Sequence, residues 1–556
     1  MTKKFETQVL IIGAGPVGLT LAIDLAQRGI TVVVAETRHR GEPPNVKCNH
    51  VAARTMEIFR RMGIATAVRE AGLPADYPND VSYRTTFIGD ELSRIHIPAR
   101  RTRYSDKSGP DGWWPTPEPP HRINQIYLEP VLFAHSEVTK GVTILSRTRI
   151  DEFSQDDHDV SAKGVNLDTG EEVQIFSEYM IGCDGGRSAV RKAIGAKLFG
   201  TDVVGRVQST FFRAPDLLSR AMQPPSWATF SLNPRRSGNV YAIDGRETFL
   251  IHNYLRADEL DFESVNRDWA IRTILGVGAD FEYEILSKED WIGRRLVADR
   301  FRDRRVFICG DASHLWIPMA GYGMNAGIAD AMNLSWQLAA RLHGWGGDAI
   351  LDAYGAERQP ITEQVSTFAM NHALALQEER EGVPANIEEP GPAGEAARKS
   401  AGEALYKLNV KQYCCGGLNF GYFYDASPLI AYDSEPAPGY TIDQFTPSTV
   451  PGCRTPHFWL ADGRSLYDAM GLEYTLLRLD GKVDARPLLD AAQRRGLPLT
   501  VLDVQSKDLP SAYRHTLVLS RPDRHVAWRG DRAPDDALAL VDRVRGCFAE
   551  QKNTSV

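Results

Sequence analysis

The N-terminal part of the chain contains an apolar run, a glycine-rich turn and a helical pattern in immediate succession. Residues 9–12 are apolar and are followed by Gly13, Gly15 and Gly18 in the G-x-G-x-x-G spacing. This order predicts a strand, a tight turn and a helix, in which backbone amides approach a pyrophosphate and the helix N-terminus faces the anion. A second apolar run ends at Glu36, where a ribose hydroxyl requires an acceptor. The unit therefore predicts a bound adenine dinucleotide.

Composition and charge exclude several other classes of protein. The 556 residues carry 64 Lys plus Arg against 72 Asp plus Glu, and the net charge of −8 offers no basic surface for nucleic acid. No apolar run reaches the length of a membrane span and no signal peptide is visible, so we expect a cytoplasmic protein without a membrane partner. The seven cysteines are scattered and form no C-x-x-C pair, which argues against a disulfide framework or a metal site.

Two further glycine-bearing segments follow buried runs of the parallel-strand type. The run at 179–183 ends in Asp184-Gly185, which is either plain turn chemistry or a contact with cofactor phosphates. The run at 305–309 ends in Gly310-Asp311, and Asp311 can accept hydrogen bonds from sugar hydroxyls. Glycines at 321, 323 and 327 let the backbone approach a large flat group, and the positive end of the following helix would stabilise an anionic ring system.

Polar side chains lie near these segments in the sequence. Lys47 and Arg54 flank the start of an amphipathic helix predicted within 50–65, where they are either solvated charges or contacts to a phosphate or ribityl group. Gln125 stands at the start of a helix predicted over 123–132. Residues 76–122 are rich in Pro, Gly and aromatics, which indicates a lid or ligand loop, although the tryptophan pair at 113–114 also fits simple packing.

Short alternating runs between 206 and 254 predict an antiparallel sheet inserted between pieces of an α/β domain. Such a sheet is a plausible floor for a small-molecule pocket. Tyr241, His252 and Tyr254 lie on its predicted strands, and for each of them a structural role in the sheet is favoured over a catalytic one.

The second half of the chain is predicted to be helical first and mixed α/β later. A helix is expected over 344–378 with a break at Pro360, followed by a connector over 379–401. A domain boundary is expected between 436 and 451, where turn-forming residues cluster. After it, strands and helices alternate over 475–528 and a C-terminal helix follows, which suggests a small α/β domain.

Taken together, these motifs resemble the FAD-dependent aromatic hydroxylases, the single-component flavoprotein monooxygenases of the para-hydroxybenzoate hydroxylase fold, and most closely their phenol hydroxylase-like branch. The matching segments are 13–18 with Glu36, the Asp-Gly motif at 184–191 and the Gly-Asp motif at 310–336. Segments 451–459 and 521–528 are similar to the C-terminal thioredoxin-like domain of that branch, so the resemblance covers nearly the whole chain. Two departures are Lys47, where relatives commonly carry arginine, and Met319, where a second proline is frequent.

The resemblance implies an α/β fold with a Rossmann-like FAD-binding domain, an inserted antiparallel substrate sheet and a C-terminal thioredoxin-like domain. The implied parts are FAD-binding at 1–80, 123–200 and 296–375, a substrate or lid insertion at 81–122, a substrate sheet at 201–295, a helical connector at 376–440 and the thioredoxin-like domain at 441–556. The C-terminal domain is expected to have a structural or dimer-supporting role, since it lacks a C-x-x-C pair, and we expect a homodimer.

The implied activity is hydroxylation of a phenolic ring, possible substituents being chloro, nitro or alkyl groups. NADPH or NADH would reduce bound FAD, and O₂ would react through a flavin C4a-hydroperoxide. Implied catalytic residues are Tyr241, His252, Tyr254 and Pro318. Implied cofactor contacts are Gly13, Ala14, Gly15, Pro16, Val17, Gly18, Glu36, Lys47, Arg54, Gln125, Asp184, Arg191, Gly310, Asp311, Pro318, Gly321, Gly323, Met324 and Asn325.

Three other interpretations remain open at this point. A flavin dehydrogenase or oxidase of the same fold would not insert oxygen into its substrate. A structural dinucleotide-binding protein would not turn over at all. A thiol redox role for the C-terminal domain would require a reactive Cys453.

Overall fold

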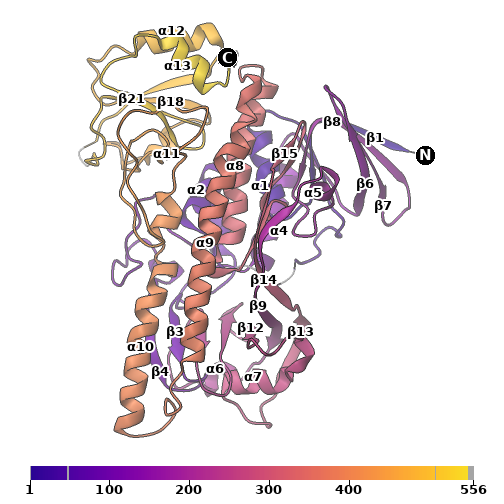
Figure 1. The fold of residues 1–556 in the computed structure, drawn as a ribbon, viewed down its shortest axis with the longest axis vertical. Coiled ribbons are helices and arrows are strands. Elements are labelled where there is room, and N and C mark those ends of the chain that lie inside the picture. The colour runs from indigo at the N-terminus through magenta and orange to yellow at the C-terminus, as the bar shows by residue number, and fades with distance from the viewer. Residues whose placement is uncertain (1, 45, 47–48, 507–508, 549–556) are drawn as a thin grey trace, which may run out of the picture.

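The computed structural model describes residues 2–44, 46, 49–506 and 509–548, and its strands form three separate sheets (Figure 1). In Figure 1 the second sheet lies at the lower end of the long axis, and the first sheet lies on the right. The third sheet and its helices form the C-terminal domain, which lies at the upper end (Figure 1). The predicted fold class is confirmed.

The first sheet carries the glycine-rich turn. Its eight strands are β15 (Arg302–Asp303), β16 (Val306–Ile308), β8 (Glu172–Gly182), β1 (Lys3–Ile12), β2 (Val32–Ala35), β5 (Val142–Leu145), β6 (Thr148–Gln155) and β7 (Val160–Asn166). β1 lies between β2 and β8 and is parallel to both. Every residue of β2 is buried, as expected for a parallel strand covered on both faces. Helices α1 (Pro16–Gln27) and α8 (Tyr322–Leu342) pack together on this sheet.

The second sheet contains nine strands. They are β17 (His314–Trp316), β14 (Trp291–Ala298), β9 (Leu198–Arg213), β12 (Thr248–Tyr254), β11 (Gly238–Ala242), β10 (Ala228–Ser231), β3 (Val81–Arg84), β4 (Glu91–Ile95) and β13 (Glu284–Lys288). The segment predicted as a separate insertion at 81–122 thus begins with two strands of this sheet, because β3 pairs in parallel with β10. The domain boundaries themselves stay a prediction.

Cross-strand register sets which side chains share a face of the second sheet. Ser209 is opposite His252, His252 is opposite Asn239, and Asn239 is opposite Phe230. Because side chains alternate along a strand, Tyr241 and Tyr254 lie on the same face as this row. The sheet therefore presents a set of polar and aromatic groups to one side.

Two long helices follow the sheets, and both differ from the expectation. α9 (Ala353–Glu381) continues through Pro360, and α10 (Pro392–Tyr413) occupies much of the predicted connector. Buried Tyr354, Ile361 and Val365 hold α9 on both sides of the proline, so packing offsets the backbone hydrogen bond that proline removes. The shorter helices of this part are α2 (Ala53–Met62), α3 (Ala65–Glu70), α4 (Gln125–Val138), α5 (Ala189–Ala193), α6 (Leu217–Arg220) and α7 (Arg267–Leu275).

The C-terminal domain matches the predicted alternation closely. Its elements are α11 (Leu466–Ala469), β18 (Tyr474–Arg478), α12 (Arg486–Arg495), β19 (Leu499–Asp503), β20 (Leu517–Ser520), β21 (Val526–Gly530) and α13 (Ala537–Val544). β18 is parallel to β19 and antiparallel to β20. Burial raises the pKa of Cys453 to about 11, so this thiol stays protonated and a thiol redox role is disfavoured.

The C-terminal domain is held to α9 by a buried ion pair. Arg521 makes two contacts with Glu357, at 2.5 and 2.7 Å, and both side chains are fully buried.

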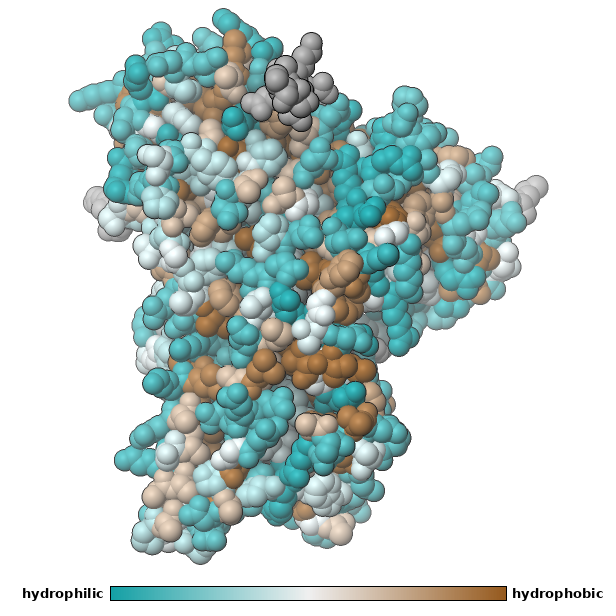
Figure 2. All heavy atoms as spheres, in the orientation of Figure 1, coloured by the Kyte–Doolittle hydropathy of each residue, from teal (hydrophilic) through white to brown (hydrophobic). Residues whose placement is uncertain are grey.

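Figure 2 shows mainly polar side chains on this face of the molecule, with apolar ones gathered in a band across its middle. Among the described helices, none is both long and apolar enough to cross a bilayer.

Candidate active site

The glycine-rich turn joins β1 to α1 with a backbone that only glycine accommodates. Gly13 has a φ of +105°, and a Cβ there would lie 2.4 Å from the carbonyl oxygen of Cys183. A Cβ on Gly15 would meet nothing within 4 Å, so open space faces this residue. No side chain caps α1, and its first turn carries no acid, which leaves its amides available to an anion. These features fit a dinucleotide pyrophosphate.

Glu36 lies beside this turn. Its carboxylate accepts hydrogen bonds from the amides of Ala14, at 2.8 Å, and Arg38, at 2.9 Å. Burial raises the pKa of Glu36, but these amides and the Arg38 guanidinium outweigh it and hold the pKa below its usual range. The ionised carboxylate has further lone pairs, which a ribose hydroxyl is able to use.

The Asp-Gly motif is occupied by contacts within the protein. One oxygen of Asp184 caps α5 by accepting from the amides of Ala189 and Val190, at 2.7 and 3.2 Å, while its Oδ1 is shielded from solvent and has no partner among the described residues. Arg191 donates to the carbonyls of Ala312 and Gly186, both at 3.0 Å. Arg191 thereby ties this motif to the Gly-Asp motif, and the cofactor roles of both residues stay a prediction.

The Gly-Asp motif leads into α8 through a left-handed glycine. Gly321 has a φ of +60° and precedes the first turn of α8, which carries no acid. Asn325 accepts from the amide of Ala52 at 2.8 Å and donates to the carbonyls of Gly321, at 2.7 Å, and His50, at 3.1 Å. Asn325 therefore fixes the 50–52 segment against the helix start, and Asp311 is exposed nearby.

Two other predicted cofactor contacts, Arg54 and Gln125, have partners within the protein, and their cofactor roles stay a prediction. The Arg54 guanidinium lies 4.5 Å from the ring centroid of Tyr422, and its Nη2 is 2.7 Å from Nε2 of His525, so its contacts are with the C-terminal part of the chain. Gln125 begins α4 and donates to Glu129 at 3.1 Å. Lys47 lies outside the described residues.

A cavity of about 310 Å³ joins the second sheet to the Gly-Asp motif. It brings together the four predicted catalytic residues, Tyr241, His252, Tyr254 and Pro318, with Asp311 and Gly321. Aromatic side chains form much of its wall. They are Trp227, Phe230, Trp291, Trp316 and Tyr413. A pocket of this kind suits a flat aromatic ligand.

The three titratable residues predicted to be catalytic, Tyr241, His252 and Tyr254, are neutral near pH 7. Burial raises the pKa of both Tyr241 and Tyr254. Burial and then the charge of Arg380 lower the pKa of His252 to about 4. Asn239 donates to the Tyr254 hydroxyl at 3.0 Å. A general base requires a pKa near the working pH, and none of these three residues has one.

Arg122, which the sequence reasoning did not single out, is the cation of this cavity. It is 3% exposed, and its Cζ lies 4.6 Å from the ring centroid of Trp227. Its Nη1 contacts Nδ1 of His50, while its Nη2 has no partner among the described residues. The nearby acid Asp111 is paired with Arg103 at 2.6 Å. Arg122 therefore has an unused guanidinium donor at the cavity wall.

His50, which Arg122 contacts, is neutral. Burial, and then the charges of Arg122 and Arg103, hold the pKa of His50 well below its usual range. The only sequence signal for this site is an arginine at the end of a proline-rich stretch, three residues before α4 begins. Among the described residues, no group of three or more His, Cys, Asp or Glu side chains is arranged to hold a metal ion.

Comparison with known proteins identifies the family. A model of the FAD binding domain matches residues 6–369, and a model described as the aromatic-ring hydroxylase C-terminal domain matches residues 448–550. The chain is 30% identical to FAD-dependent monooxygenase apdD of Emericella nidulans, over 99% of this chain and 92% of that protein. It is 29% identical to phenol 2-monooxygenase of a Pseudomonas strain, over 99% and 94%.

The same conclusion follows from a solved structure. RebC with bound 7-carboxy-K252c superposes with a TM-score of 0.87 at 32% identity, covering 98% of this chain and all of that one. The glycine turn, the uncapped helix and the aromatic cavity define a flavoprotein oxidoreductase. The chain belongs to the family of FAD-dependent aromatic-ring hydroxylases, and it is a flavin-dependent monooxygenase of that family.

Proposed function

We propose that this enzyme hydroxylates a phenolic aromatic ring with O₂, using NADPH or NADH as the reductant. The observation that carries this proposal is the aromatic-walled cavity, which lies against the Gly-Asp motif and contains the buried guanidinium of Arg122 with its unpartnered Nη2. When bound and reduced, FAD supplies the oxygen-activating chemistry. The chain itself binds the ring, orients it and keeps water away.

Ionisation of the phenol is the step in which the protein's own residues matter most. An ionised phenol is a more electron-rich ring and is easier to hydroxylate. Tyr241, His252 and Tyr254 are poor bases at neutral pH, because the first and third are neutral phenols and the pKa of His252 is about 4. The fixed charge of Arg122 lowers the pKa of a bound phenol, since it stabilises the phenolate.

In this mechanism the phenol gives its proton to solvent water before it enters the cavity and binds as the phenolate, so no strongly basic side chain is required. The guanidinium Nη2 of Arg122 donates to the phenolate oxygen, and the sheet residues orient the ring. Asn239 and Tyr254 hold the far side of the cavity through their 3.0 Å hydrogen bond. Arg122 thus takes the part that the sequence reasoning gave to a base on the sheet.

The test is a panel of phenols, catechols and nitrophenols with the purified flavoprotein under ¹⁸O₂. We expect NADPH or NADH oxidation to rise with a substrate and its product to gain one labelled oxygen atom. Faster NAD(P)H oxidation that yields peroxide alone, for every phenol, would contradict hydroxylation. A dehydrogenated product without label would instead support the alternative, a flavin dehydrogenase or oxidase of the same fold.

The remaining expectations on partners and location stay proposals. We infer a homodimer, with which a structural role for the C-terminal domain agrees, since that domain has no C-x-x-C pair. We also infer a cytoplasmic location. Analytical ultracentrifugation tests the dimer, and a monomer at micromolar concentration would contradict it.

A further inference from the structure

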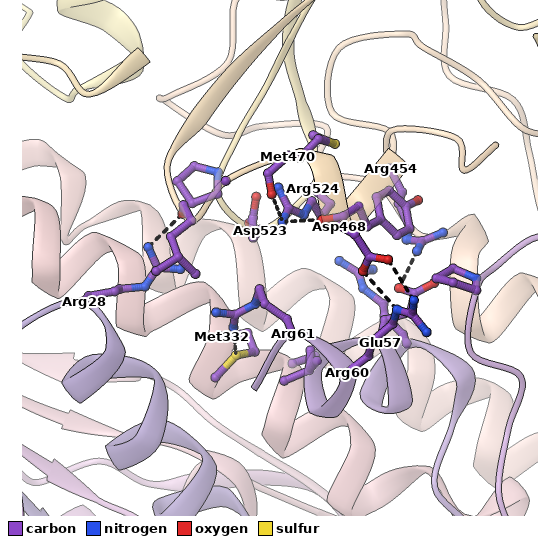
Figure 3. Close-up of a pocket in the computed structure, with 18 of the residues that line it drawn as sticks. Arg28, Glu57, Arg60, Arg61, Met332, Arg454, Asp468, Met470, Asp523 and Arg524 are labelled. Atoms are coloured by element: carbon purple, nitrogen blue, oxygen red, sulfur yellow. Dashed lines mark hydrogen bonds and ion pairs between the residues drawn. The ribbon is translucent and has the colours of Figure 1, made fainter. Parts of the chain in front are cut away.

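A second cavity, also of about 310 Å³, lies where the N-terminal half meets the C-terminal domain (Figure 3). Its lower wall is formed by the end of α1, by α2 and by α8, and its upper wall by loops of the C-terminal domain. The lining contains six arginines and three carboxylates. They are Arg28, Arg54, Arg60, Arg61, Arg454, Arg524, Glu57, Asp468 and Asp523.

Three of the six arginines are neutralised. Arg60 makes a two-pronged pair with Asp468, at 2.8 and 2.9 Å. Arg454 pairs with Glu57 at 2.5 Å. Behind the cavity, Arg521 contacts two carboxylates, Glu357 and Asp523, and the surplus negative charge of that cluster offsets Arg54.

The other three arginines share two carboxylates. Arg28 and Arg61 both contact the fully buried Asp24, at 2.9 and 2.5 Å, and Arg28 also lies 3.5 Å from Glu473. Arg524 donates only to backbone carbonyls, those of Met470 at 3.1 Å and Tyr467 at 3.4 Å. Three guanidinium groups thus meet two carboxylates, and one positive charge is left without a carboxylate.

Hydrogen-bond donors on both walls are also unused. The Nη1 atoms of Arg54, Arg61 and Arg524 are each shielded from solvent and have no partner among the described residues. Figure 3 shows Arg61 on α2 and Arg524 on the C-terminal domain on opposite walls. Burial, and then the charge of Arg61, lower the pKa of Arg524 to about 10, which indicates that these two guanidinium groups repel each other.

We propose that this cavity binds a phosphate group, held between Arg28 and Arg61 on one wall and Arg524 on the other. The surplus positive charge and the unpartnered Nη1 donors of Arg61 and Arg524 match an anion, and guanidinium forks match phosphate oxygens. The apolar side chains of Ile58, Met332 and Leu472 complete the lining and suit an organic group attached to the phosphate. Because the ligand would contact both walls, it would strengthen the docking of the C-terminal domain.

The test uses the FAD-saturated enzyme, in which the dinucleotide site is filled. Inorganic phosphate is titrated by calorimetry at constant ionic strength, set with NaCl. We expect saturable binding of one phosphate per chain, weakened at least tenfold in Arg524→Gln and in Arg61→Gln. The matched control is Arg464→Gln, an exposed arginine of the same domain paired with Asp462, which should bind within twofold of the unaltered enzyme.

A second arm identifies the source of the phosphate. AMP that binds more tightly than phosphate, in a manner lost in Arg524→Gln, indicates a nucleotide, whereas equal affinities indicate free phosphate; adenosine serves as the phosphate-free control. The proposal is overturned if phosphate shows no saturable binding, or if neither arginine variant weakens it more than the control does. Two variants are included so that failure of one to fold leaves the other decisive.

Discussion

The two cavities have the same volume, about 310 Å³, yet their chemistry is opposite. The cavity at the Gly-Asp motif has aromatic walls, neutral tyrosines and one arginine, Arg122, whose Nη2 has no partner among the described residues. The cavity at the C-terminal domain has six arginines against three carboxylates in its lining. Size therefore says little about the ligand. The charge of the lining does, since it separates a flat ring with one negative charge from a phosphate held by several guanidinium groups.

The cavities also depend on different parts of the fold. The first is built largely from the second sheet and from backbone that faces the cofactor. The second exists only while the C-terminal domain is docked, because its walls belong to different domains. Variants that remove the flavin, the docking contact or a single charge should therefore affect one cavity and spare the other.

The largest effect on activity is expected from Gly13→Ala, which acts on the FAD site and leaves the second cavity unchanged. The added Cβ would lie 2.4 Å from the Cys183 carbonyl, in a backbone conformation that alanine strains to adopt. We expect a colourless protein whose affinity for FAD falls at least about 100-fold, roughly 2.7 kcal/mol. Absorbance at 450 nm after FAD titration measures this. Gly355→Ala on α9, where a Cβ meets nothing, is the control and should stay yellow.

Glu357→Gln weakens the contact between α9 and the C-terminal domain, on which the second cavity depends. It leaves Arg521 buried with one carboxylate fewer, and removing one partner of a buried pair costs about 3 kcal/mol of unfolding free energy. Urea unfolding of the FAD-bound enzyme measures the loss. The control, Glu363→Gln on the same helix, removes a more exposed carboxylate and should cost less than about 1 kcal/mol. Equal losses in the two variants would contradict the assigned docking role.

Arg122→Gln tests the single charge of the first cavity. Loss of a charged hydrogen bond of about 2 kcal/mol corresponds to a roughly 30-fold fall in kcat/KM for weakly acidic phenols. Nitrophenols, which ionise more readily, should lose less, a difference that a purely structural role would not produce. Arg122→Lys should recover part of the loss and Arg464→Gln should show none. Equal losses for all phenols would contradict the phenolate role.

The smallest effect is expected from His252→Asn and concerns pH. The pKa of His252 is about 4 in the folded protein, below its usual value, so the unfolded chain takes up a proton first as the pH falls. The stabilising contribution is complete above about pH 6.5 and declines between there and about pH 4. Between pH 7 and 5.5 the unaltered enzyme should lose roughly 1 kcal/mol more than the variant. Parallel pH profiles of urea unfolding would contradict this.

Local sequence patterns predicted much of this fold. The G-x-G-x-x-G turn, Glu36 and the strand that ends before Asp184 were predictable because glycine and apolar periodicity act over a few residues. α10 lies within the predicted helical connector at 376–440, but its bounds were not predicted. The Pro and Gly residues at its start are typical of a linker, whereas the Ala, Glu, Lys and Leu residues that follow favour a helix.

The charges of the two cavities were less accessible to prediction. The position of Arg122 in the cavity is set by contacts with residues far from it in the sequence, such as His50 and Trp227. Arg54 is predicted to contact the cofactor, and this stays a prediction. A single arginine in a sequence does not indicate which residues it will contact within the protein. The structure places it against Tyr422 and His525.

α9 runs unbroken for 29 residues beside both the first and the second sheet (Figure 1). Near its start it carries Glu357, whose buried charge is paired with Arg521 of the C-terminal domain. Removing the C-terminal domain would therefore leave a carboxylate without its cation in the interior of the remaining protein. We expect that the catalytic part is not stable without the last hundred residues.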